Sequence, residues 1–212
     1  MQHPTAYRER GRAPLFPAAA IRPAAIACLL VCLFLFHSEV MASQVRSLNL
    51  EEMVQRAGRI FSGRCVQVRV AEDPGTHQKA TFVTFVVDQT VKEGGPPKVT
   101  IKVLGEQGWP GKRETGLEGA PRYAEGEEVV LFLYGESRSG FTSPVGFGQG
   151  KFSVVRDKKG GRLAINEHGN RGLLERLSSR AEERLKGRAA RHRDRPGIPP
   201  EDLLEMVKSL LP

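Results

Sequence analysis

Cysteine is scarce in this chain, and its placement limits the available chemistry. The 212 residues contain three cysteines: Cys28 and Cys32 lie within one apolar run, and Cys65 stands apart from them. If that run is removed from the mature protein, Cys65 has no partner for an intrachain disulfide. A lone cysteine on a strand is typically a small buried hydrophobe rather than a nucleophile. We therefore expect Cys65 to be a buried free thiol.

Long apolar runs are also lacking. The apolar run AAIACLLVCLFLF, residues 24–36, has 13 residues, whereas a membrane-crossing helix needs about 20. Arginines precede it, and Val40 and Ala42 follow at the spacing of a signal peptidase site. We expect residues 1–42 to be a signal peptide cleaved near Ala42, and the protein to be periplasmic or extracellular. A retained membrane anchor formed by the same segment is the alternative.

Complete nucleotide-binding motifs are missing. The glycine-rich stretch SPVGFGQGKFSVV, residues 143–155, places Lys151 directly after Gly150, as a P-loop does. A P-loop would need glycine where Val145 stands and a hydroxyl where Phe152 stands, and the dinucleotide fingerprint would need glycine at position 151. We therefore expect this stretch to bend the chain ahead of a strand.

Signatures of metal sites and hydrolases are missing too. After the leader, the histidines at 77, 168 and 192 are far apart and have no CxxC or HExxH companion, and no serine lies in a GxSxG elbow. We accordingly expect no cofactor, no metal centre and no catalytic residues. A hydrolase with an unrecognised site is a third hypothesis, which would require a pocket with perturbed titratable groups.

What the sequence contains in quantity is strand-forming pattern. Asn49 and Glu52 have the spacing of a capping box, which predicts a short N-terminal helix ending near Gly58. Six segments between residues 59 and 166 then show strand patterns with no long helical pattern between them. Because parallel strands need long crossovers, the sheet should be mostly antiparallel. We expect a mostly β domain over residues 43–170, a small antiparallel barrel or sandwich that is OB-like.

Alternation within the strands predicts which side chains face the core. In KVTIKVL, Val99, Ile101 and Val103 share one face, and Thr100 lies on the other. In RCVQVRV, alternation places the valines at 66, 68 and 70 on one face and Gln67 and Arg69 on the other.

One connection is longer than a compact domain needs. About 18 residues without periodicity, GEQGWPGKRETGLEGAPRY, run from Gly105 to Tyr123, and loops of this length are usually functional or disordered. They include the only tryptophan. Trp109, Lys112 and Arg113 are therefore a candidate ligand loop, the alternative being that Trp109 is a lid over one end of the barrel.

The positive charge is concentrated near the C-terminus. Residues 43–157 carry 15 Lys and Arg against 14 Asp and Glu, whereas residues 158–212 carry 13 against 8, which gives +5 of the chain's +8. We expect a basic helical or linker segment over 171–198 and an amphipathic helix over 199–212, opened by two prolines. This predicts a basic, helical C-terminal extension of the β domain.

Four arginines in this segment recur at a spacing of four, which places them along one stripe of a continuous helix. Such a stripe is a candidate contact for an anionic surface, either polymer or lipid. Nearby glutamates favour the alternative, a solvated helix. The four residues are Arg176, Arg180, Arg184 and Arg188.

Several segments, taken in order, resemble a family of exported bacterial β-rich proteins of unknown function. They are NLEEMVQRAGRIFSGRCVQVRV, FVTFVVDQTVKEG, GAPRYAEGEEVVLFLY, VGFGQGKFSVVRD and RLAINEHGN, covering about residues 48–170. The resemblance implies a short helix followed by a compact exported β domain. It transfers no catalytic residues.

These features together favour an exported, non-enzymatic binding or interaction module of the cell envelope or extracellular space. The expected partner is an exported protein or an anionic polymer of the envelope. Peripheral contact with a membrane is a further alternative. We expect no specific binding of nucleic acid. The alternative from another class is an inhibitor or accessory partner of a secreted protease, by analogy with OB-like inhibitor barrels.

The leader generates a first prediction. Protein isolated from its native host should begin near Ser43, because the 13-residue apolar run and the residues before Ser43 fit signal peptidase. Intact-mass measurement reads this directly. A membrane-bound species that retains Met1 to Phe36 would contradict it.

Overall fold

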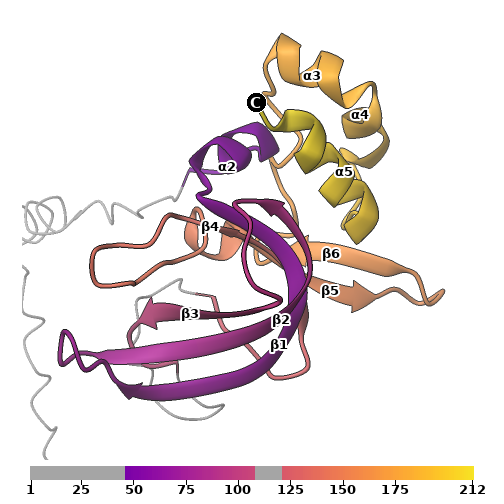
Figure 1. Cartoon of the computed structure of the whole chain (residues 1–212). Coiled ribbons are helices and arrows are strands. Elements are labelled where there is room, and N and C mark those ends of the chain that lie inside the picture. The colour runs from indigo at the N-terminus through magenta and orange to yellow at the C-terminus, as the bar shows by residue number, and fades with distance from the viewer. Residues whose placement is uncertain (1–45, 108–120) are drawn as a thin grey trace, which may run out of the picture. The chain divides into compact units, whose positions relative to one another are not determined.

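The computed structural model describes residues 46–107 and 121–212. The predicted signal peptide and the candidate loop residues Trp109, Lys112 and Arg113 lie outside the described residues. The elements run in chain order (Figure 1) as α2 (Leu50–Arg56), β1 (Arg59–Glu72), β2 (Lys79–Lys92), β3 (Lys98–Leu104), β4 (Glu128–Leu133), the 3-10 helix η1 (Phe147–Gln149), β5 (Lys151–Arg156), β6 (Arg162–Asn166), α3 (Ser179–Leu185), α4 (Arg188–His192) and α5 (Pro200–Leu210).

The strands form one antiparallel sheet, which confirms the prediction of a mostly β, antiparallel domain. The described residues give a six-stranded sheet in the order β3-β2-β1-β4-β5-β6. Every strand pair in it is antiparallel. The sheet curves strongly along its long strands β1 and β2 (Figure 1).

The sheet does not close into the predicted barrel. Its two edge strands, β3 and β6, do not pair with each other. Each edge is instead bridged by a neighbouring loop segment, Lys102 of β3 with Phe141 and Ala164 of β6 with Ile198. Each bridge engages one residue of its edge strand, and within the described residues the sheet is open.

The face assignment is confirmed on β3 and partly wrong on β1. Val99, Ile101 and Val103 are all buried. On β1, by contrast, Val66 is 38% exposed, because it is the extra residue between the pairs formed by Cys65 and Gln67 with β2. Such a bulge turns the residues before and after it by one position, so Cys65, rather than Val66, faces inward.

Both faces of the sheet carry apolar side chains, because β4 contributes to each of them. Val129, Leu131 and Leu133 belong to the core on the concave side, together with Phe61 and Phe85. The alternate residues of β4 face a second core, where they meet Ile60, Phe152 and Ala164 from the neighbouring strands. Two apolar faces on a single sheet require two separate covers.

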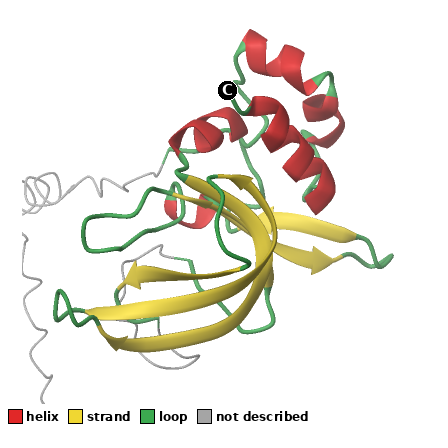
Figure 2. Ribbon diagram, in the orientation of Figure 1, coloured by secondary structure: helices red, strands yellow, loops and turns green. Residues whose placement is uncertain are grey.

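Helices cover the second face (Figure 2). Its core cluster includes side chains of α2, α3, α4 and α5 together with those of β1, β4, β5 and β6. The C-terminal segment is thus part of the hydrophobic core, and not the extension that the sequence suggested. Its last helix, α5, begins at Pro200 and buries Leu203, Val207 and Leu210, as predicted. No helix in the described ranges is long and apolar enough to span a membrane.

The capping box of α2 is also present, and it links the helix to the C-terminal segment. The Asn49 side chain accepts a hydrogen bond from the Glu52 amide at 2.8 Å, and the Glu52 carboxylate accepts one from the Asn49 amide at 3.1 Å. The Asn49 side-chain amide then donates to the carbonyl of Arg176 at 2.9 Å. One residue therefore caps α2 and ties it to the chain ahead of α3.

The alternation on β3 generates a matched pair of substitutions. Ile101→Ser should lower the free energy of unfolding by about 3–5 kcal/mol, since it leaves a cavity and buries a hydroxyl. Thr100→Ser keeps the hydroxyl that lies 2.9 Å from that of Thr84 and should change stability by no more than about 0.5 kcal/mol. Urea unfolding of both variants measures the difference. Equal losses would contradict the face assignment.

Candidate functional site

The glycine run bends the chain ahead of β5, as the sequence predicted. Gly146 has a φ of 65°, in the left-handed region that favours glycine, and the 3-10 helix η1 follows it. At Gly150, a Cβ would lie 2.6 Å from the carbonyl oxygen of Val145 and 2.9 Å from that of Phe132. These two glycines therefore permit a left-handed turn and a close approach of backbones.

Gln149, within the same run, fastens the start of the described chain. Its side chain is buried, accepts a hydrogen bond from the Leu48 amide at 2.8 Å and donates to the carbonyl of Arg46 at 3.2 Å. Its own carbonyl accepts a bond from the Asn166 side chain at 3.0 Å. The role of the run is therefore to hold residues 46–48 against the sheet, which explains a glutamine between two glycines.

A cluster of titratable side chains lies on the concave face of the sheet, where β1, β4 and β5 meet. Lys151 is buried, and its ammonium donates to Glu127 Oε1 at 2.5 Å and to Ser153 Oγ at 3.1 Å. Ser153 donates to the same carboxylate oxygen at 2.5 Å. The Lys151 ammonium also lies 5.4 Å from the ring centroid of Tyr123.

The geometry of this cluster does not activate a nucleophile. A serine–lysine pair requires an amine with a free lone pair to take the serine proton, whereas the Lys151 ammonium is paired with Glu127. Burial, and then the negative charge of Glu127, raises the pKa of Tyr123. Burial likewise raises the pKa of Cys65. Both groups are therefore held in their protonated, less reactive forms, and the cluster joins β4 to β5.

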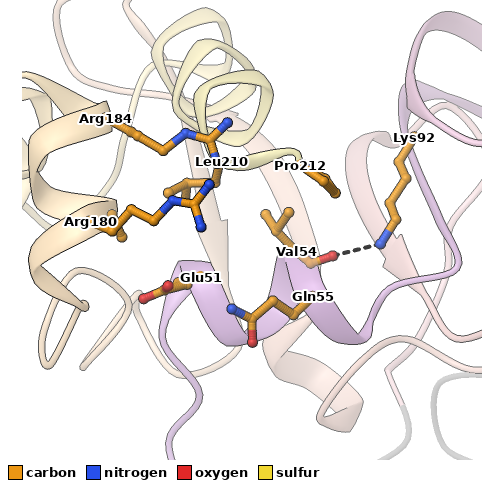
Figure 3. Close-up of a pocket in the computed structure, with 9 residues that line it drawn as sticks. Glu51, Val54, Gln55, Lys92, Arg180, Arg184, Leu210 and Pro212 are labelled. Carbon is orange, nitrogen blue, oxygen red and sulfur yellow. Dashed lines mark hydrogen bonds between the residues drawn. The ribbon is translucent and has the colours of Figure 1, made fainter.

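A basic pocket lies between α2, α3 and the end of α5, with Lys92 of β2 at its side (Figure 3). Its volume is about 340 Å³. Cationic side chains and apolar side chains both line it, and they come from segments far apart in sequence. The lining residues are Glu51, Val54, Gln55, Lys92, Arg180, Ala181, Arg184, Leu210 and Pro212.

The predicted stripe of four arginines is divided by the structure. Helix α3 begins only after Ser178, whose hydroxyl caps it, and it ends at Lys186 in a left-handed conformation. Arg176 precedes the helix with a φ of 52° and donates to the carbonyl of Ser47 at 2.9 Å. Arg188 belongs to the next helix. The single helix that the spacing of four required is thus interrupted at both ends, and no continuous stripe forms.

Arg180 and Arg184 remain together, because both belong to α3 and lie four residues apart. Their side chains extend side by side into the basic pocket (Figure 3). Arg184 donates to the carbonyl of Leu211 at 2.5 Å, which holds its guanidinium in place. In the part of the chain that the structure describes, Arg180 has no hydrogen-bond or ion-pair partner.

Cationic side chains outnumber acidic side chains in the pocket lining. The Lys92 ammonium donates to the carbonyl of Val54 at 2.8 Å (Figure 3), which fixes its position without neutralising it. Glu51 is the one acidic side chain in the lining, and it accepts hydrogen bonds from the Ser178 amide at 2.9 Å and from the Ser178 hydroxyl at 2.8 Å. Three cationic side chains therefore face one acidic side chain that is already engaged.

Lys92, Glu51 and Gln55 are pocket residues that the sequence reasoning missed. They come from β2 and α2, more than eighty residues before α3, and only the packing of α2 against the C-terminal helices places them here. Part of the pocket could be predicted, because the spacing of arginines in the basic C-terminal segment identified Arg180 and Arg184 as candidates.

The described residues contain no group of three or more histidine, cysteine or carboxylate side chains that could hold a metal ion. Comparison with known proteins adds no relative: no protein-family model, no curated protein and no solved structure matches this chain.

The concave face generates a prediction for Cys65. Since its side chain is buried and burial raises its pKa, little thiolate should form at pH 8 in the folded protein, and a thiol reagent should react slowly. In denaturant the reaction should be complete within the mixing time of an ordinary assay. Peptide mass mapping reads Cys65 separately from the other cysteines. Fast labelling of the native protein would show that the thiol is accessible.

Proposed function

We propose that the protein is an exported binding module that recognises anionic groups through the basic pocket formed by α2, α3 and α5. The observation that carries this proposal is the Arg180 guanidinium, which lines the pocket beside Arg184 and has no partner among the described residues. An arginine offers five donors in a planar fork that matches carboxylate and phosphate oxygens.

The pocket is organised for an anion before any ligand arrives. Arg184 and Lys92 are each held by a backbone carbonyl, so little side-chain entropy remains to be lost when an anion binds between them. Two of the three cations are thereby fixed, and Arg180 is free to complete the contact. This division of roles supports recognition of a discrete anionic group.

Export and fold class are part of the proposal. Export is supported by the apolar leader over 24–36 and by the resemblance to exported β-rich proteins. An OB-like relationship is supported by the strand order β3-β2-β1-β4-β5 and by the strong curvature of a sheet that remains partly open.

Pyrophosphate is a suitable probe because it is compact and multiply charged. At low salt it should bind the full chain at one site, and Arg180→Gln should weaken binding about tenfold or more, since a hydrogen bond to a charged group contributes about 1.5–3 kcal/mol. Binding should also weaken as salt rises. Isothermal titration calorimetry measures both effects.

Arg191→Gln is the matched control. Arg191 is an exposed residue of α4 outside the pocket, so the variant loses the same formal charge from the same C-terminal region. It should bind pyrophosphate as the wild type does. Equal weakening in both variants would show a diffuse effect of net charge and would contradict the pocket as the site, as would no binding at all.

A further inference from the structure

The basic pocket has an apolar side as well as a charged one, and this narrows its ligand. We infer that its ligand is a small amphiphile, an oxyanion head group carried on a short apolar chain. This inference rests on the proposed function and adds to it a short apolar chain on the ligand. The observation is that Val54, Ala181 and Leu210 line the same cavity as Arg180 and Arg184.

The apolar lining is continuous with the core beneath the helices. Val54 of α2, Ala181 of α3 and Leu210 of α5 all belong to the core cluster that these helices form with the sheet. Of the apolar residues in the lining, Pro212 is exposed, whereas Val54, Ala181 and Leu210 are largely buried and form the floor of the pocket. A ligand with a few methylene groups would place them against this apolar wall, and each methylene of the ligand removed from water contributes about 0.8 kcal/mol, or roughly a fourfold gain in affinity.

The charged side selects the head group. Arg180, Arg184 and Lys92 supply three cationic side chains, and Glu51 is the one acidic side chain in the lining. This excess of cationic side chains favours a phosphate monoester, which carries about −1.5 to −2 at neutral pH. A carboxylate shares the oxyanion chemistry but carries one charge, so it should bind at the same place more weakly.

The size of the cavity favours a small molecule over a polymer. A volume of about 340 Å³ lies at the low end of the range of about 300–1,000 Å³ that small-molecule sites occupy. It accommodates one head group and a short chain. The anionic polymer considered from the sequence would have to present such a group at an end.

Octyl phosphate, octanoate and methyl phosphate are the probes that separate head from chain. With the full chain in isothermal titration calorimetry, octyl phosphate should bind at least about tenfold more tightly than methyl phosphate, which has the same head and only one carbon. Octanoate should bind more weakly than octyl phosphate. Arg180→Gln should weaken the affinity for octyl phosphate about tenfold. Because this variant retains residues 24–36, any binding of the octyl group to that apolar segment is common to the variant and the wild type.

Gln55 provides a variant that blocks the chain without touching a charge. It lines the pocket, is exposed, and lies on α2 (Figure 3). Gln55→Trp should reduce the affinity for octyl phosphate to that for methyl phosphate and leave methyl phosphate within about threefold of wild type, whereas Gln55→Ala should keep the preference for the octyl chain. Unchanged unfolding midpoints confirm that both variants fold.

The outcomes distinguish the two proposals. Equal affinity for octyl and methyl phosphate, together with Arg180-dependent binding of pyrophosphate, would overturn the apolar chain and leave anion recognition intact. Octyl binding that survives both Arg180→Gln and Gln55→Trp would place the amphiphile elsewhere and overturn the inference. Absence of binding by every probe would overturn both.

Discussion

The structure depends on one constraint: a single antiparallel sheet presents two apolar faces, and each must be removed from water. Central strand β4 carries valine, leucine or phenylalanine at every position from 129 to 133, so neither of its faces can be left solvated. Curvature of β1 and β2 folds the concave side over its own side chains. The opposite face is not enclosed by curvature, so helices cover it. These helices are α2, ahead of the first strand, and α3 to α5, after the last strand.

That requirement explains how the basic pocket forms from distant residues. Helix α2 and the C-terminal helices must meet because they cover the same face, and Asn49 fastens one to the other through the carbonyl of Arg176. Where α2, α3 and α5 converge, a pocket remains at the surface, and Arg180, Arg184 and Lys92 line it. The pocket is therefore a consequence of how the sheet is covered, and its cationic side chains are the basis of the proposed preference for anions.

The sequence predicted the features that depend on local pattern and missed those that depend on packing. Alternation placed Val99, Ile101 and Val103 inside, and the capping box and Pro200 located the starts of two helices. The bulge at Val66 depends on pairing with β2, and the bridges that Phe141 and Ile198 make to the edge strands depend on how distant loops pack. Neither feature can be read from the periodicity of residues along the sequence. Likewise, a spacing of four joined Arg176 to Arg188, because it cannot register the left-handed residues that interrupt the helix.

The central claim is that Arg180 and Arg184 together bind an anion, and the side-chain resonances of the arginines test it most directly. In an NMR titration of ¹⁵N-labelled protein with methyl phosphate, the Nε–Hε signals of Arg180 and Arg184 should shift with one common saturation curve, while that of Arg191 stays in place. Assignment by single Arg→Lys substitutions identifies each signal. Shifts spread evenly over all exposed arginines, or no saturable shift at Arg180, would contradict the account.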